Sequence, residues 1–231
     1  MNAIRAVFED SNEAKREVRC GEAAAPLDIM MSVAREALGE SCTDNNGATP
    51  VFKKGRMDLG SMAPSVSVLA DQLLRTHPIS VEPGFEGNAG ISGGAWHDHA
   101  DDDVALVYLR FSEGTVDLPL HVHEFSDRFI AVADGFGLFH YMPRGARCNE
   151  LRSVVVQAGD IVAFTRGLVH TFTAPVAELV LLSYHAPYFE FEDPRQFTIS
   201  DVSIRDGYGW MPGSIQSRSL NQAVIQVAPG V

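Results

Sequence analysis

From about residue 81 onward, the sequence consists of short β-prone runs separated by turn residues. The runs include DVALVYLRF, RFIAVADG, SVVVQAG and ELVLLSYHA, which are rich in Val, Ile, Leu and Phe. Turn signals recur roughly every 8–12 residues, a spacing typical of an all-β sandwich or barrel. The sequence therefore predicts a mostly β domain over residues 81–192.

Residues 1–80 are predicted to form an α-helical extension that packs on this domain. Residues 26–40, PLDIMMSVAREALGE, begin with a proline suited to a first helical turn and carry apolar residues along one face. Residues 64–76 show a second apolar stripe at helical spacing. The first residues show a third such pattern, formed by Ile4, Val7 and Phe8.

Two stretches are predicted to lack helices. Residues 41–63 are rich in Asn, Gly, Ser and Thr, which favours a loop. Residues 193–231 form a tail rich in Ser, Gly and Gln, with one late β-prone stretch, AVIQVA. This tail is expected to be an added strand or a dimer arm, and the sequence does not choose between them.

The charge and the cysteines exclude several functions and locations. A net charge of −12 disfavours nucleic acid as a partner, and with it a DNA-binding role for the N-terminal helices. The sequence has no long apolar run that would span a membrane, and its charged N-terminus lacks a signal core. The three scattered cysteines fit a reducing compartment. We therefore expect a cytoplasmic protein without nucleic-acid or membrane partners.

Three histidines form the pattern with the clearest chemical meaning. His121 and His123 are two residues apart in a β-prone run, so their side chains leave the same face of a strand. His170 opens a later strand in the stretch AGDIVAFTRGLVHTFTA. Imidazole nitrogens are common ligands of divalent transition metals, so these three residues are candidate metal ligands.

The spacing of these residues resembles the two sequence motifs of the cupin superfamily. The residues that carry the resemblance are Gly114, His121, His123, Gly135, Gly159, Gly167 and His170. The chain departs from the family pattern at Thr165, where proline is usual, and at Ala174, where asparagine is usual. The gap from Gly114 to His121 is also one residue longer than usual. The resemblance implies a single cupin barrel, a double-stranded β-helix of the jelly-roll type, and a homodimer.

One departure concerns the metal site itself. Six residues separate Arg128 from Gly135, and the family has a glutamate ligand at this spacing. A guanidinium has no lone pair to donate, and it would repel a divalent ion 5 Å away by about 6–7 kcal/mol at an effective dielectric of 20. An unneutralised Arg128 beside a metal is therefore disfavoured.

Three arrangements remain open. Three neutral histidines hold the metal while Asp127, Glu124 or an acidic ligand neutralises Arg128. Alternatively, a strand bulge turns Asp127 inward as a fourth ligand. In the third arrangement no metal binds, and Arg128 anchors an anionic small molecule through a bidentate contact.

Strand alternation also predicts the lining of a cavity. If Arg128 points inward, the side chains expected to form a mostly apolar substrate pocket with it are Phe125, Ile130, Val132, His140 and Phe172. For His140, the sequence favours a packed or hydrogen-bonded histidine over one that faces the cavity. The remaining apolar residues are equally consistent with an ordinary core.

Two functions follow from these alternatives. The first is a metal-dependent enzyme, a dioxygenase or else an isomerase or lyase, in which His121, His123 and His170 bind Fe(II), or Mn, Ni or Zn. Arg128 would then act on a small, anionic substrate. The second is a binding or sensory module that has lost its metal and holds an anionic ligand through Arg128.

Overall fold

A computed structural model describes residues 3–8, 18–19, 26–42, 50–58, 65–76, 79–81, 91–97, 103–116, 118–142, 150–191 and 193–199 of the chain. The helices are α1 (Pro26–Cys42) and α2 (Val66–Thr76). The strands before the predicted barrel are β1 (Ala3–Phe8), β2 (Val18–Arg19), β3 (Phe52–Asp58) and β4 (Ser80–Val81). The later strands are β5 (Ile91–His97), β6 (Ala105–Phe111), β7 (His121–Val122), β8 (Asp127–Met142), β9 (Arg152–Gln157), β10 (Asp160–Phe164), β11 (Val169–Thr173), β12 (Leu179–Ala186) and β13 (Thr198–Ile199).

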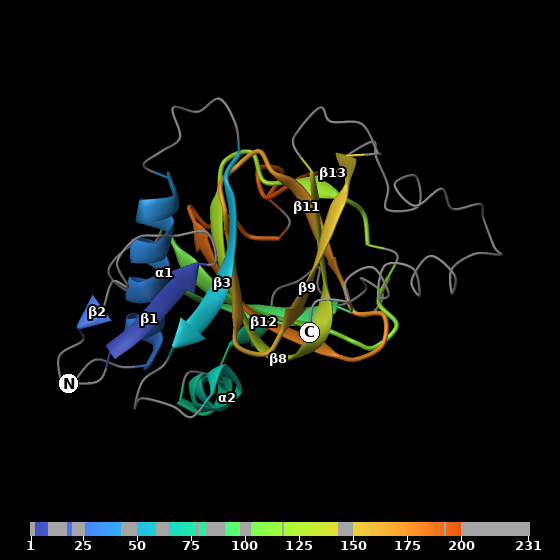
Figure 1. The fold of residues 1–231 in the computed structure, drawn as a ribbon. Coiled ribbons are helices and arrows are strands. Elements are labelled where there is room, and N and C mark those ends of the chain that lie inside the picture. Colours follow the sequence, from blue (N-terminus) through green and yellow to red (C-terminus); the bar gives the residue numbers. More distant parts are fainter. Residues whose placement is uncertain are drawn as a thin grey trace.

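The strands form two antiparallel sheets that share one long strand. The first sheet has the order β1-β3-β10-β8-β12-β6-β5-β4, with β2 beside β1. The second sheet contains β9, β8, β11, β7 and β13. The first half of β8 pairs in the first sheet and its second half pairs in the second, so β8 joins the two walls of a barrel (Figure 1).

Gly135 lies where β8 passes from one sheet to the other. Its φ is +77°, and a Cβ built there would lie 1.7 Å from the backbone oxygen of Glu178. Only glycine fits this close approach. Among the described residues, the glycines with positive φ are Gly114, Gly135, Gly159 and Gly167, the same four that carry the cupin resemblance.

The two faces of the first sheet have different partners. Phe129, Ala131 and Ala133 of β8 pack with apolar residues of α1 and α2 on the outside. Ile130 and Val132 alternate with them and pack inside the barrel. The predicted helical cover and the predicted alternation along this part of β8 are both confirmed, and Figure 1 shows both helices outside the sheets.

Two parts of the N-terminal prediction are wrong. Residues 3–8 form β1 and not a helix, and residues 52–58, predicted as loop, form β3. β3 pairs with β10 along its length, where Lys54 and Arg56 lie 3.5 and 3.8 Å from the buried carboxylate of Asp160. These pairings join residues about 100 positions apart, so the local sequence pattern does not reveal them.

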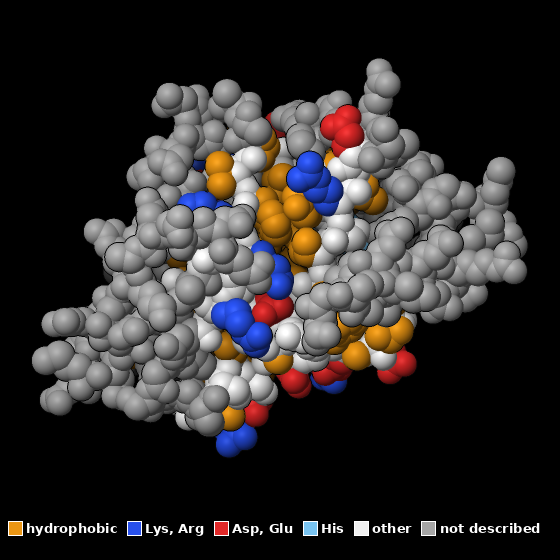
Figure 2. Space-filling view, viewed as in Figure 1, with side chains coloured by type: hydrophobic (Ala, Val, Ile, Leu, Met, Phe, Trp, Pro, Cys, Tyr) orange, Lys and Arg blue, Asp and Glu red, His pale blue; other side chains and the backbone are white. Residues whose placement is uncertain are grey.

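The predicted C-terminal tail is described only in its first part. β13 pairs with β7, as expected for an added strand, whereas AVIQVA lies outside the described residues. Within the described part of the chain, no helix is long and apolar enough to cross a membrane. Figure 2 shows hydrophobic side chains gathered in the middle of one face, next to Lys and Arg side chains.

Candidate metal centre

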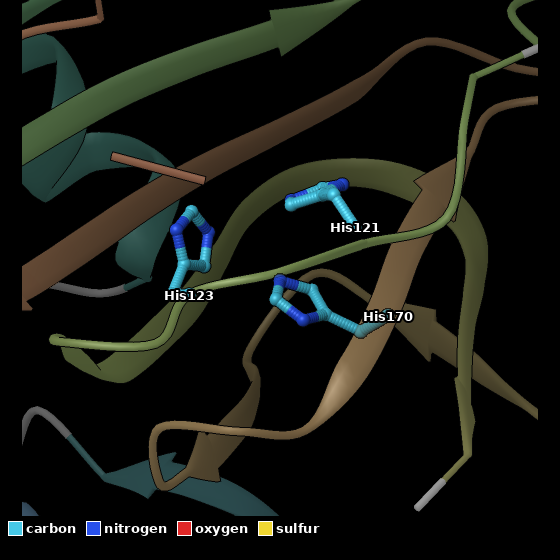
Figure 3. A group of neighbouring side chains, drawn as sticks. All are labelled: His121, His123 and His170. Atoms are coloured by element: carbon cyan, nitrogen blue, oxygen red, sulfur yellow. The ribbon is translucent and has the colours of Figure 1, made fainter. Parts of the chain in front are cut away.

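His121, His123 and His170 meet inside the barrel. His170 on β11 is the direct cross-strand partner of His121 on β7, and His123 follows β7 directly. One nitrogen from each ring lies within 4.8 Å of those of the other two. Figure 3 shows the three rings gathered around one space, with His170 coming from a separate strand. The structure therefore brings together the three predicted ligands, close enough for one ion to contact all three after small ring rotations.

Backbone carbonyls orient all three rings. The Nδ1 atom of His121 lies 3.2 Å from the oxygen of Pro119, and that of His170 lies 3.0 Å from the oxygen of Leu168. Nδ1 of His123 contacts the backbone oxygen of Gln196. A carbonyl only accepts, so a hydrogen bond in these contacts places the proton on Nδ1 and leaves the Nε2 lone pair for a ligand bond. For His123 this is one of two forms, because its Nδ1 also faces Arg128.

The three imidazoles are held neutral. Burial, with the positive charge of Arg128 as a smaller cause, lowers the pKa of His121 to about 4. Burial also lowers the pKa of His123 and of His170 well below 6.5. Since a metal ligand must be deprotonated, the rings are in the required state at neutral pH. A three-histidine donor set of this kind fits a divalent transition metal.

Arg128 points into the same site, which is the orientation that the predicted pocket assumed. Its side chain is 1% exposed. One terminal nitrogen, Nη2, lies 3.0 Å from Nδ1 of His123 and 3.3 Å from Oε1 of Gln196. The other, Nη1, donates to the hydroxyl of Ser126. Burial lowers the pKa of Arg128 to about 9, which leaves the guanidinium charged at pH 7.

The carboxylate of Asp127 turns away from the triad. It accepts hydrogen bonds from Arg166, through the backbone N–H at 2.7 Å and the guanidinium at 2.9 and 3.2 Å. The prediction that Asp127 serves as a fourth ligand is therefore wrong, because its oxygens are used to fix the turn before β11. Within the described residues, no carboxylate makes an ion pair with Arg128.

The site opens into an apolar cavity of about 360 Å³. The three histidines and Arg128 lie in its wall, and the remaining lining residues are Ile91, Leu109, Phe111, Leu118, Pro119, Ile130, Phe164, Thr171, Phe172, Ser183, His185, Phe191, Gln196 and Phe197. This described lining includes one cation and no carboxylate. An anion is therefore the charged ligand that the cavity favours.

The cavity lining includes two of the five residues predicted for the pocket and leaves out the other three. Ile130 and Phe172 line the cavity. Val132 faces inward but packs in the core beyond the cavity. Phe125 is 50% exposed, because β7 ends at Val122 and the chain bends before β8 begins. His140 does not line the cavity either.

His140 is directed away from the cavity because β8 changes its alternation. In the first half of β8, even-numbered residues such as Ile130 face inward, whereas after Gly135 the inward residue is Phe139. His140 therefore lies on the other face, where its ring bonds to the hydroxyls of Ser153 and Thr173 at 2.7 and 2.9 Å. Burial lowers its pKa to about 4. It is the hydrogen-bonded histidine that the sequence left as an alternative.

Several site residues were not predicted. His185 pairs with Arg128 across the sheet, so both side chains leave the same face, and its Nε2 lies 3.0 Å from the hydroxyl of Ser183. Its Nδ1 is buried without a hydrogen-bond partner in the described part of the chain. Gln196 comes from the predicted C-terminal tail and belongs to neither histidine motif. Placing Arg128 beside β12 would have found His185, whereas nothing in the sequence marks Gln196.

Comparisons with known proteins give likeness at the level of structure only. No protein-family model and no curated protein matches the chain. The capsular polysaccharide assembling protein CapF of Staphylococcus aureus matches with 13% identity and a TM-score of 0.43, over 55% of this chain and 32% of that one. The DMSP lyase DddQ of Ruegeria pomeroyi matches with 9% identity and a TM-score of 0.44, over 79% and 80%. Oxalate decarboxylase of Lactobacillus farciminis matches with 14% identity and a TM-score of 0.41, over 66% and 42%.

None of these likenesses transfers an activity to this chain, which spans about a third of the CapF chain. The fold follows from the molecule itself. Two antiparallel sheets share β8, positive-φ glycines occupy the motif turns, and the two histidine motifs meet inside the barrel. The chain has the cupin fold, a mostly β barrel with a partly helical N-terminal extension.

Proposed function

We propose that this chain is a metal-dependent enzyme that acts on a small organic acid, and that it is an oxygenase. One observation carries the proposal. A neutral three-histidine set, oriented for metal binding, shares an apolar cavity with a buried guanidinium that makes no ion pair with a carboxylate of the described residues. A metal offers an electrophilic centre, and the guanidinium offers a partner for a substrate carboxylate.

Each residue has a separate task in this proposal. His121, His123 and His170 would hold the ion, Fe(II) by preference, with Mn, Ni or Zn as alternatives. A bound redox-active ion would supply oxygen chemistry. Arg128 binds and orients the acid group, and the aromatic and aliphatic wall excludes water from the rest of the substrate.

Metal analysis tests the proposal. Untagged wild-type protein is compared with His170→Ala by elemental analysis, and His97→Ala serves as the matched control because His97 is an exposed histidine outside the triad. We expect metal in the wild type and in the control, and a large loss in His170→Ala. Equal metal content in all three proteins would refute the three-histidine site.

Activity is tested separately by oxygen consumption with each of the four metals over a panel of small carboxylates. Neutral amides of the same acids are the controls. We expect the wild type to turn over carboxylates. Arg128→Met should turn them over much less well, because its KM for them is higher. Turnover that is indifferent to both the amide replacement and Arg128→Met would contradict the role of Arg128.

A second function is favoured by the contact between Arg128 and His123. A guanidinium donating to Nδ1 of His123 would leave its Nε2 protonated and unable to bind a metal. A barrel held in this state would be a metal-free module that binds anionic ligands. Carboxylate binding without metal in the wild type would support it.

A further inference from the structure

Two groups compete for one nitrogen of His123. Its Nδ1 contacts the backbone oxygen of Gln196, which accepts hydrogen bonds, and Nη2 of Arg128 at 3.0 Å, which donates them. A neutral imidazole has one N–H and one lone pair, so Nδ1 satisfies only one of the two at a time. The His123 ring therefore has two tautomers, which differ in the nitrogen that carries the proton.

The choice decides whether His123 is a metal ligand. When Nδ1–H donates to Gln196, Nε2 offers its lone pair to an ion. When Nδ1 accepts from Arg128, the proton lies on Nε2 and the third ligand is lost. The contact between Arg128 and His123 and the binding of a metal are therefore mutually exclusive.

The charge of Arg128 also opposes metal binding until a carboxylate is bound. Arg128 is buried, and its described surroundings contain no ion-pairing carboxylate, because Asp127 binds Arg166. A divalent ion beside it adds positive charge to a cavity that already holds one cation. A carboxylate bound to Arg128 would occupy Nη2, release Nδ1 of His123 and lower the repulsion.

We propose that Arg128 and His123 make carboxylate binding and metal binding mutually dependent, with each ligand raising the affinity of the site for the other. This inference rests on the proposed metal site. Gln196 is the positioning residue: its backbone oxygen selects the metal-binding form of His123, and its side-chain oxygen, 3.3 Å from Nη2, holds Arg128. The carboxylate thus binds to Arg128 and, by releasing His123, also controls metal binding.

The test measures Mn(II) affinity through the EPR signal of the free ion, using the full chain at constant ionic strength. Acetate and benzoate are the carboxylate probes, and acetamide and benzamide are their neutral counterparts. We expect carboxylate to lower the Kd for Mn(II) by about 5–150-fold, the range of ordinary allosteric coupling, and the amides to leave it unchanged. Calorimetry should show the carboxylate Kd falling by the same factor when Mn(II) is present.

Two variants separate this mechanism from direct binding of carboxylate to the metal. Arg128→Met should bind Mn(II) more tightly than the wild type without carboxylate, and should lose the response to it. Gln196→Glu places a carboxylate beside the guanidinium, and should bind Mn(II) tightly while no longer responding to benzoate. Both variants keep a side chain of similar length, and circular dichroism verifies their folding.

The outcomes are distinguishable. Wild-type protein that binds Mn(II) equally with carboxylates and amides would overturn the coupling and leave the metal site standing. An undiminished carboxylate effect in Arg128→Met would also overturn it. Absence of Mn(II) binding in the wild type and both variants, under every condition, would overturn both proposals.

Discussion

His140 provides a quantitative test of the described fold, because its ring is buried and neutral on the outer side of the second sheet. Burial lowers its pKa from 6.5 to about 4 in the folded protein. Above pH 6.5 the ring is neutral in both the folded and the unfolded chain. As the pH falls below 6.5, the unfolded chain takes up a proton that the folded protein refuses, so stability is lost down to about pH 4.

The size of this loss follows from the two pKa values. At pH 5 the unfolded histidine is mostly protonated and the folded one is mostly neutral. The difference amounts to about 2 kcal/mol between pH 7 and pH 5, and to about 3 kcal/mol at the acid limit.

The measurement is urea unfolding of the wild type and of His140→Gln at both pH values. Glutamine retains groups that can bond to the hydroxyls of Ser153 and Thr173. The other buried histidines contribute equally in both proteins, so we expect the variant to lose about 2 kcal/mol less than the wild type between pH 7 and pH 5. His97→Gln, at an exposed position, controls for the substitution itself. Identical pH dependence in the wild type and His140→Gln would refute the placement of His140.

Two further predictions concern the framework of the site. Gly135→Ala should cost about 4 kcal/mol or more in unfolding free energy, since its Cβ would meet a backbone oxygen at 1.7 Å, whereas Gly114→Ala, with positive φ but open space, should cost about 1–2 kcal/mol. Similar denaturation midpoints for the two would contradict the close approach at Gly135. Asp127→Ala should cost about 2–3 kcal/mol because it removes the acceptor of the Arg166 backbone N–H, whereas Arg166→Ala, which removes a half-exposed side chain, should cost under about 1 kcal/mol. Equal losses in chemical denaturation would show that the side-chain pair, and not the backbone contact, fixes this turn.

The parts of the molecule that sequence reasoning found are those encoded by local spacing. The alternation of side chains along a β-strand placed His121 and His123 on one face and Ile130 inside the barrel. The motif spacing supplied His170, and it placed Arg128 at the ligand position, whereas the inward orientation of Arg128 was an assumption.

The errors arise where regular alternation stops or where partners are distant in sequence. The bend after β7 exposes Phe125. The register of β8 against β12 skips Ala133, and this bulge reverses the faces and removes His140 from the cavity. β3 pairs with β10 across about 100 residues, and its sequence, FKKGRMD, shows no apolar alternation. Gln196 acts mainly through a backbone oxygen, and such an atom leaves no signature in residue identity.

Because backbone oxygens orient the three histidine rings, this orientation does not depend on the identity of the residues that supply them. Every residue at positions 119, 168 and 196 carries a carbonyl, so no point mutation there deletes an acceptor. The orientation of the ligand rings depends on the path of the chain and tolerates change in the neighbouring side chains. Proteins with this barrel can therefore differ widely in the neighbouring side chains and still keep the three metal ligands, provided that the three histidines remain.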